Sequence, residues 1–535
     1  MYKYINTAKS KQCYNMCRRY KEMKKFRKIF AAAASMGLAV TAFSAPVLAQ
    51  TVDTTYNCSL SARVTDAGEV VNKMTIDFGA GNRVSNVDVD TFTVTAKSTI
   101  KIEDEDYKGK VQYDGERKIV KVETDGQYVN VYFDENDGYG STLTYISDAE
   151  KGYARNYPGE LEYTIVQNKG VTLTAADGRE IDNDYIAKYT TDNTVTNDET
   201  AKFESVIVEN GINYQYYDAG DADSLIVWFH GNGEGDLLNS GNNVAQMLAN
   251  RGTVAWASDE AQEIFGGAHV MSFQAPDTWY YAQRDGLLEI AYNEINDLIK
   301  AKNIDPEKVY VSGCSAGGYM TTRMLIAYPD LFKAAMINCP ALDVATIRGG
   351  QTPTDEELAS LTKSDTAIWL VQGVTDSSVA TDECSKRMFK ILTEGQETTE
   401  IRYLQNINSD FTTYETKDNK YKLTLYDTVN VDGANKINLE EDYDMDGIPT
   451  LVHYNDHWTW IFTLNNNPKD ASGTSIMEWA ANYNVDAEQP ATPVAPSPDS
   501  PEKAVPTGDN VLTSLYATAA LLSVCGLAFV KRKFN

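Results

Sequence analysis

Lys308-Val-Tyr-Val-Ser-Gly-Cys-Ser-Ala-Gly317 is the segment of this chain most informative about its fold. Its first half is a short apolar run with β-branched residues, which is typical of a buried strand. Gly317 to Tyr328 then continues as a helix candidate that stops at Pro329. The G-x-S-x-G spacing between the two elements allows a sharp strand-to-helix turn that exposes a serine hydroxyl. We therefore predict that Ser315 is a nucleophile at the end of a strand.

The chain after Ala201 alternates apolar strands with helices, which indicates a mostly parallel sheet with helices on both faces. The predicted strands contain Leu225–Phe229, Val309–Val311, Ala334–Ile337 and Ile368–Val371. Leu288, Tyr292, Ile295 and Ile299 fall on one face of a predicted helix. We predict a single α/β catalytic domain over residues 200–485.

Residues 50–195 have a different pattern, with short β-branched and aromatic runs separated by turns. The predicted strands start at Val84, Phe92, Ile119, Tyr128 and Val171, and Asp-Gly pairs supply turns. Several short strands over this length indicate an all-β sandwich. We assign it no catalytic residue and interpret it as a spacer or packing module.

A serine hydroxyl needs a base, and the base needs an orienting acid. In α/β folds of this kind the chain order is Ser, then Asp or Glu, then His. Only His453 and His457 follow Ser315. We favour His457, because the aromatic residues around it, Trp458 among them, can wall the site and contact substrate. Asp376 lies just after a late predicted strand and is the expected acid, with Asp382 as its nearest competitor.

The negative oxygen of the transition state also needs hydrogen-bond donors. His230-Gly-Asn-Gly-Glu-Gly235 follows the predicted strand Leu225–Phe229, and its glycines permit close approach of backbone N–H groups. Asn232 or Gly233 would supply one donor, and Ala316 the other. We interpret His230 and His269 as structural. The loop lacks the G-x-x-x-x-G-K-[ST] pattern of a phosphate loop.

No metal or other cofactor is expected. The chain has no C-x-x-C pair, so a zinc site of that type is not indicated. Asp442-Tyr-Asp-Met-Asp-Gly447 matches the first half of a calcium loop, but His453 stands where the loop needs Glu. We interpret Asp442–Asp446 as an acidic turn, with a weak calcium site as the alternative.

The two ends of the chain predict export and anchoring. Residues 1–49 resemble a signal peptide, with a basic segment at Lys24–Lys28, an apolar run and the cleavage motif Val47-Leu-Ala49. Val511–Val530 is an apolar run long enough to span a bilayer, and a basic tail follows it within residues 511–535. Residues 486–510 form a Pro-rich linker. We predict an extracellular protein held at the cell surface.

Charge and cysteine usage fit this location. The formal net charge is −28, and residues 1–49 are basic, so the rest of the chain is still more acidic. Nucleic acid is therefore excluded as a partner. Four cysteines within residues 50–485 are too few for a disulfide framework. Buried free thiols are expected, with a Cys339–Cys384 bridge as the alternative.

The sequence around Ser315, from Asn303-Ile-Asp-Pro-Glu-Lys to Tyr328-Pro-Asp-Leu-Phe-Lys-Ala334, resembles the polyhydroxybutyrate-depolymerase and feruloyl-esterase branch of the α/β hydrolases. That branch overlaps in pattern with prolyl-oligopeptidase catalytic domains. With a β domain in front, the chain resembles esterases that carry an immunoglobulin-like N-terminal domain. The resemblance implies Ser315 as nucleophile, Asp376 as acid and His457 as base. The family often has Gly before this His, where the chain has Asp456.

Val505-Pro-Thr-Gly508 resembles the sortase wall-anchoring signal of Gram-positive bacteria, although it lacks one residue of the L-P-x-T-G pattern. The resemblance implies attachment to the cell wall or plasma membrane of such a bacterium.

Together these patterns predict a serine carboxylic-ester hydrolase that acts on a small-molecule or polysaccharide-linked ester. A serine peptidase of the prolyl-oligopeptidase type would use the same three residues, but the β-propeller usual in that type is absent. A non-catalytic surface-binding protein on a hydrolase scaffold is the third hypothesis.

Overall fold

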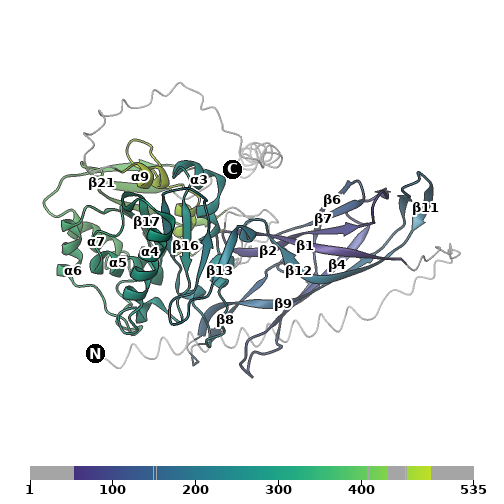
Figure 1. Ribbon diagram of the computed structural model, residues 1–535, viewed down its shortest axis with the longest axis horizontal. Coiled ribbons are helices and arrows are strands. Elements are labelled where there is room, and N and C mark those ends of the chain that lie inside the picture. Colours follow the sequence, from purple (N-terminus) through teal and green to yellow (C-terminus); the bar gives the residue numbers. More distant parts are fainter. Residues whose placement is uncertain are drawn as a thin grey trace, which may run out of the picture.

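The computed structural model describes residues 54–148, 150–151, 153–405, 410–431, 452–453 and 455–483. Figure 1 shows an all-β part, coloured purple to blue, beside an α/β part coloured teal to yellow-green. The β part ends with β12 (Lys188–Thr196), and the first strand of the large mixed sheet is β13 (Phe203–Val206).

The β part consists of three sheets around one apolar core. Its strands are β1 (Thr55–Thr65), β2 (Gly68–Asp77), β3 (Arg83–Ser85), β4 (Phe92–Ile100), β5 (Val111–Glu116), β6 (Ile119–Asp125), β7 (Tyr128–Phe133), β8 (Leu143–Asp148), β9 (Tyr153–Gln167), β10 (Val171–Thr174), β11 (Glu180–Tyr185) and β12. One sheet has the order β12-β1-β2-β7-β6, and β5-β4-β9-β8 and β11-β10-β3 form the others. Buried residues of all three sheets, such as Leu60, Val94 and Leu173, share one cluster. The all-β expectation therefore holds, whereas the immunoglobulin-like identity stays a prediction.

The longest strand of this part was not predicted from the sequence. β9 spans 15 residues and contains Pro158, a residue that usually demotes a run to a non-strand. The Val84 run is also shorter than expected, because β3 ends at Ser85. Figure 1 shows β8 and β9 reaching from the β part toward the α/β part.

The α/β part is built on a ten-stranded sheet of the order β13-β14-β16-β15-β17-β18-β19-β22-β21-β20. Its further strands are β14 (Tyr214–Tyr217), β15 (Leu225–Phe229), β16 (His269–Phe273), β17 (Val309–Cys314), β18 (Ala334–Asn338), β19 (Ala367–Gly373), β20 (Thr398–Tyr403), β21 (Phe411–Thr416) and β22 (Tyr421–Tyr426). The six strands from β16 to β22 are parallel, and the strands outside them pair antiparallel. The four predicted strands are confirmed.

Both faces of this sheet are covered. The helices are α2 (Ala245–Leu248), α3 (Asp259–Ile264), α4 (Leu287–Lys302), α5 (Ala316–Ala327), α6 (Asp355–Ser360), α7 (Ser385–Leu392), α8 (Trp460–Leu464) and α9 (Ile476–Asn482). Alternate residues of β15 belong to different apolar clusters. Val227 shares one cluster with residues of α4, α5 and α7, and Trp228 shares the other with residues of α3, α8 and α9. This explains why the central strands read as continuous apolar runs.

The parallel strands deliver the candidate residues to one edge of the sheet. Gly231–Gly235 follow β15, Ser315 follows β17 and Asp376 follows β19. Carboxyl ends of parallel strands meet at one edge, where open α/β sheets bind their ligands. The segment Asn455–Thr459 before α8 reaches the same edge, because His457 is bonded to Ser315.

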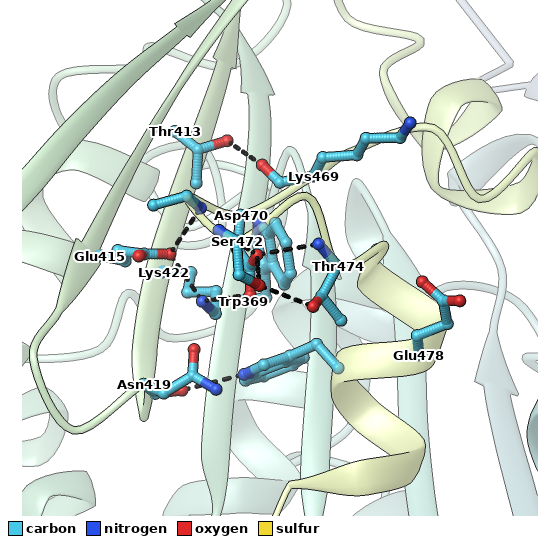
Figure 2. A network of polar contacts seen from close by, with 12 residues as sticks. Trp369, Thr413, Glu415, Asn419, Lys422, Lys469, Asp470, Ser472, Thr474 and Glu478 are labelled. Atoms are coloured by element: carbon cyan, nitrogen blue, oxygen red, sulfur yellow. Dashed lines mark hydrogen bonds and ion pairs between the residues drawn. The ribbon is translucent and has the colours of Figure 1, made fainter. Parts of the chain in front are cut away.

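A buried cation ties the end of the described chain to this sheet. The side chain of Lys422 in β22 is fully buried, and its Nζ lies 2.7 Å from Glu415 and 3.1 Å from Asp470 (Figure 2). Thr413 donates a 2.8 Å hydrogen bond to the carbonyl of Lys469 beside it. The ammonium group bridges a carboxylate of β21 and one of the loop before α9, so this loop is fixed against β21 and β22.

Several predictions fall on residues that the structure does not describe. These are the signal peptide 1–49, the acidic turn Asp442–Asp446, the linker 486–510 and the anchor 511–535. Among the described residues, no helix is both long and apolar enough to cross a membrane. The four cysteines of the described chain, Cys58, Cys314, Cys339 and Cys384, are buried free thiols, as expected.

Candidate active site

Ser315 stands on a sharp turn between β17 and α5. Its backbone has φ 54° and ψ −117°, a strained combination for a residue with a side chain. The glycines around it are required by contact: a Cβ on Gly317 would lie 1.9 Å from the Phe229 carbonyl oxygen, and one on Gly313 would lie 2.6 Å from the Gly317 carbonyl oxygen. The motif therefore requires glycine at both positions, because neighbouring backbone atoms leave no space for a side chain.

Three side chains from distant parts of the chain form one hydrogen-bonded line. Ser315 Oγ lies 2.9 Å from His457 Nε2, and His457 Nδ1 lies 2.8 Å from Asp376 Oδ2. The backbone N–H groups of Ser378 and Val379 each donate a 2.9 Å bond to Asp376 Oδ1. The carboxylate is thereby fixed toward the imidazole, and the imidazole toward the hydroxyl.

The electrostatics of this line suit proton transfer. Burial raises the pKa of the Asp376 carboxyl, but the bond to His457 and the backbone donors outweigh it, so the net pKa lies below the usual range. Burial of His457 disfavours its charged form, while Cys339 and Asp376 beside it raise the pKa of the imidazole above its ordinary value. Asp376 thus stabilises an imidazolium.

The competing residues lie elsewhere. Asp382 is exposed and forms an ion pair with Lys386 at 2.8 Å. His269 is buried in β16, where Tyr216 Oη lies 2.7 Å from its Nδ1. Burial lowers the pKa of His230 to about 3, and its Nε2 accepts a 2.9 Å bond from the Ala275 N–H. His453 pairs through its backbone with Asn430.

The predicted oxyanion residues border the same site. α5 begins at Ala316, so the N–H of Ala316 has no partner within the helix. Asn232 and Gly233 form the short 3-10 helix η2 (Asn232–Glu234), and both line the cavity that contains Ser315. A Cβ on Gly231 would lie only 3.5 Å from Cys314 Sγ, so this loop packs directly on the turn.

The cavity at this edge is large and belongs to both parts of the chain. It has a volume of about 1000 Å³ and contains Ser315 and His457. The predicted substrate residue Trp458 lines it and stacks on Trp460, with ring centroids 5.1 Å apart. β-part residues, among them Tyr145 and Asn156, also line it. The interpretation of the β part as only a spacer is therefore incomplete.

Asp456 and Cys339 are further residues that the sequence did not single out as part of the site. Asp456 stands where Gly is frequent in the resembling branch. Its carboxylate accepts bonds from the Thr375 hydroxyl and, at 2.9 Å, from the Val429 N–H. Since Thr375 precedes Asp376 and Asp456 precedes His457, this contact joins the two loops. Cys339 follows β18 and contacts His457. From the sequence, only the replacement of the frequent Gly by Asp456 could be noticed.

Within the residues that the structure describes, no group of three or more His, Cys, Asp or Glu side chains could hold a metal ion.

Comparison with known proteins gives one family match and several relatives. Residues 291–424 match the prolyl oligopeptidase family. An acetylxylan esterase of Coprinopsis cinerea is 57% identical over 35 residues, which are 6% of this chain and 9% of that protein. Poly(3-hydroxyalkanoate) depolymerase C of Paucimonas lemoignei is 47% identical over 47 residues, or 9% of this chain and 11% of that protein. The matches thus span about a tenth of these relatives.

One solved structure is similar over most of the chain. The crystal structure of a thermostable esterase superposes with a TM-score of 0.54 at 20% identity, covering 76% of this chain and 96% of the esterase. At this identity the similarity shows the fold. The chain therefore has an α/β-hydrolase fold and is similar to the serine hydrolases of that superfamily, both to its esterases and to the prolyl oligopeptidase family.

Proposed function

We propose that this chain is a serine carboxylic-ester hydrolase with Ser315 as nucleophile, His457 as base and Asp376 as orienting acid. The observation that carries the proposal is the line from Ser315 Oγ through His457 to Asp376, at 2.9 and 2.8 Å. Such a line turns a weak hydroxyl nucleophile into an effective one, because the proton has an acceptor in place.

The reaction follows from these groups. His457 Nε2 takes the hydroxyl proton as Ser315 Oγ attacks the ester carbonyl carbon. The N–H of Ala316 and one N–H of the loop at Asn232 and Gly233 stabilise the oxygen that becomes negative. His457 then gives its proton to the departing alcohol. Water repeats the sequence on the acyl-enzyme, releasing the acid and restoring Ser315.

The substrate, as we propose it, is a small-molecule or polysaccharide-linked ester. Two observations support this: the cavity of about 1000 Å³ exceeds the needs of an acetyl group, and the matched relatives include an esterase named for acetylxylan. Trp458 is the proposed substrate contact. We further propose export by the segment 1–49 and retention at the surface of a Gram-positive bacterium through residues 486–535.

A serine peptidase is the second candidate, because the prolyl oligopeptidase family matches residues 291–424. It would use the same nucleophile and base. Parallel assays on ester and peptide substrates separate the two activities.

The test compares the wild-type protein with Ser315→Ala and, as a matched control, Ser377→Ala, an exposed serine of the same cavity. We expect p-nitrophenyl ester hydrolysis by the wild type and the control, and a fall of about 10⁶ in kcat for Ser315→Ala. A fluorophosphonate should label Ser315 alone. Ester activity that survives in Ser315→Ala would refute the assignment. Labelled wild type that cleaves only peptides would favour the peptidase.

A further inference from the structure

The oxyanion loop, residues 231–235, is held from the side of the β part. Asn156 of β9 donates from its Nδ2 to the Gly233 carbonyl oxygen and to Glu234 Oε1, both at 3.3 Å. A Cβ on Gly233 would meet that same amide nitrogen at 3.2 Å. Tyr145, paired with Asn156 across β8 and β9, would lie 3.7 Å from the same Cβ. Two side chains of the β part therefore lie directly on η2.

A second contact holds the loop through its neighbour. Arg155 of β9 is almost fully buried and donates from Nη2 to Asp277, at 2.7 Å to the carboxylate and 3.1 Å to the carbonyl oxygen. Thr278, the next residue, donates a 2.8 Å bond to Asn232 Oδ1. A Cβ on Gly235 would lie 2.0 Å from the Asp277 carbonyl oxygen, so the two segments are in contact.

The loop has little support of its own. η2 contains three residues, and its internal bond from the Glu234 N–H to the Gly231 carbonyl oxygen is long, at 3.4 Å. Burial of the Glu234 side chain raises its pKa to about 7, although the charge of Arg155 and the hydrogen bond from Asn156 act against that rise. A helix of three residues is positioned mainly by the residues that pack against it, and here Asn156 and Arg155 of β9 are among them.

We propose that Asn156 and Arg155 are positioning residues of the active site, which hold the backbone of residues 232–233 where an oxyanion donor is needed. The β part thereby completes the catalytic machinery. The inference rests on the proposed ester hydrolysis. It gives a role to β8 and β9, which reach from the β part toward the α/β part (Figure 1).

The test measures kcat and KM separately for Asn156→Ala, Asn156→Asp and Arg155→Met on p-nitrophenyl acetate, in the full chain. Displacing a catalytic group by about 1 Å can cost about 10²-fold, so we expect kcat to fall between about 10- and 100-fold, with KM nearly constant. Asn156→Asp keeps the size but faces the Gly233 carbonyl with an acceptor, so it should be as poor as Asn156→Ala.

Asn168→Ala is the matched control, because Asn168 is an exposed asparagine at the end of β9 whose bonds stay within the β part. It should keep the wild-type kcat. A trifluoromethyl ketone, which forms a tetrahedral adduct with the serine, should bind more weakly to Asn156→Ala by a similar factor. Inhibitor binding reports misplacement of the loop, whereas active-site labelling gives the amount of folded protein, so the two causes of a lower rate can be separated.

The outcomes are distinguishable. An active wild type with unchanged kcat in both Asn156 variants would overturn the positioning role and leave the hydrolase intact. Restored activity in Asn156→Asp would show that Asn156 only fills space, which also overturns it. A wild type that is inactive toward all esters and is not labelled at Ser315 would overturn both proposals.

A different observation points to the charge of the substrate. Arg348 is the only Lys or Arg among the described residues lining the cavity. The other arginines of the described α/β part all have side-chain bonds: Arg251, Arg284, Arg323, Arg387 and Arg402. Arg348 has no such side-chain bond among the described residues, and it is exposed.

Arg348 lines the same cavity as one tyrosine from each part of the chain, Tyr145 and Tyr280. Burial raises the pKa of Tyr145 and of Tyr280, and in both cases the charge of Arg348 acts against that rise. Arg348 therefore lies within electrostatic reach of one tyrosine from each part of the chain. The geometry points to a subsite for an anionic group, a carboxylate or a phosphate, carried by the ester substrate at a distance from the scissile bond.

Two substrate pairs test this subsite: 4-acetoxybenzoate against 4-acetoxybenzamide, and monomethyl against dimethyl adipate. Arg348→Gln should lower kcat/KM for the anionic members about 10-fold and leave the neutral members within about twofold. Arg284→Gln, whose side chain is paired with Asp285, is the control and should change neither. Equal losses on both members of a pair, or no loss on either pair, would overturn the subsite.

Discussion

Replacing Asp376 by asparagine removes the charge beside His457 and keeps the size of the side chain. In the native site Asp376 Oδ2 lies 2.8 Å from Nδ1, so the proton stays on Nδ1 and Nε2 is free to accept the serine proton. An asparagine amide at the same place donates to Nδ1 and moves the proton to Nε2, the wrong tautomer. The backbone donors to Oδ1 and the 9% exposure of the residue leave no room for another orientation.

The expected loss is large. In a serine protease the same change lowers kcat by about 10⁴. Here the carboxylate is similarly buried and bonded, so we expect about 10⁴ in kcat, or about 5.4 kcal/mol at 1.36 kcal/mol per tenfold. KM should change little, because the substrate does not touch this residue.

The assay is kcat and KM on p-nitrophenyl acetate and butyrate, with protein concentration set by active-site labelling. Asp382→Asn is the control, because that carboxylate is exposed and paired with Lys386. It should behave as wild type. A loss under about tenfold for Asp376→Asn would refute the assignment of the orienting acid. A loss in Asp382→Asn instead would transfer the role to that residue.

Three further predictions concern the turn at Ser315, the proposed base His457 and the buried Lys422. Gly317→Ala should lower the unfolding free energy by about 1–3 kcal/mol in urea titrations, since its Cβ would overlap the Phe229 carbonyl; unchanged stability would contradict the packing. Because only neutral His457 accepts a proton and its pKa is raised to about 10, kcat/KM should increase with pH until the pH reaches that value, and a flat profile would contradict this. Lys422→Met removes the cation from the buried Asp470 carboxylate and the partly buried Glu415 carboxylate and should cost about 3–5 kcal/mol in thermal or urea unfolding, whereas a neutral result would show them protonated or hydrated.

The elements nearest Ser315 could be predicted because their signals are local. The strand at Val309, the helix after Ser315 and the glycines of the turn depend on residues within about one turn or strand length of each other. The structure places β17 at Val309–Cys314 and α5 at Ala316–Ala327, close to the expected bounds. The chain order of nucleophile, acid and base likewise follows from the order of parallel strands.

Other elements were missed because their signals were weak or broken. β9 contains Pro158 and Gly159, and β20 is exposed along much of its length, so neither shows a clean apolar pattern. The polar segment after Asp376 therefore did not reveal the strands β20 to β22 that extend the sheet. In these segments, pairing with neighbouring strands outweighs the intrinsic strand propensity of the residues, and a single sequence does not show which strands will pair.

The α/β class, the sharp turn at Ser315 and the candidates Asp376 and His457 could be predicted from the sequence, because periodicity and glycine spacing act over short distances. The contact of Asn156 with Gly233, 77 positions further along the chain, and that of Lys422 with Asp470 became evident from the folded chain alone. Such contacts depend on how whole layers pack, and no local pattern encodes the distance between residues on different layers. The Ser315 hydroxyl could therefore be predicted from the sequence, whereas the tertiary contacts that position the groups around it could not.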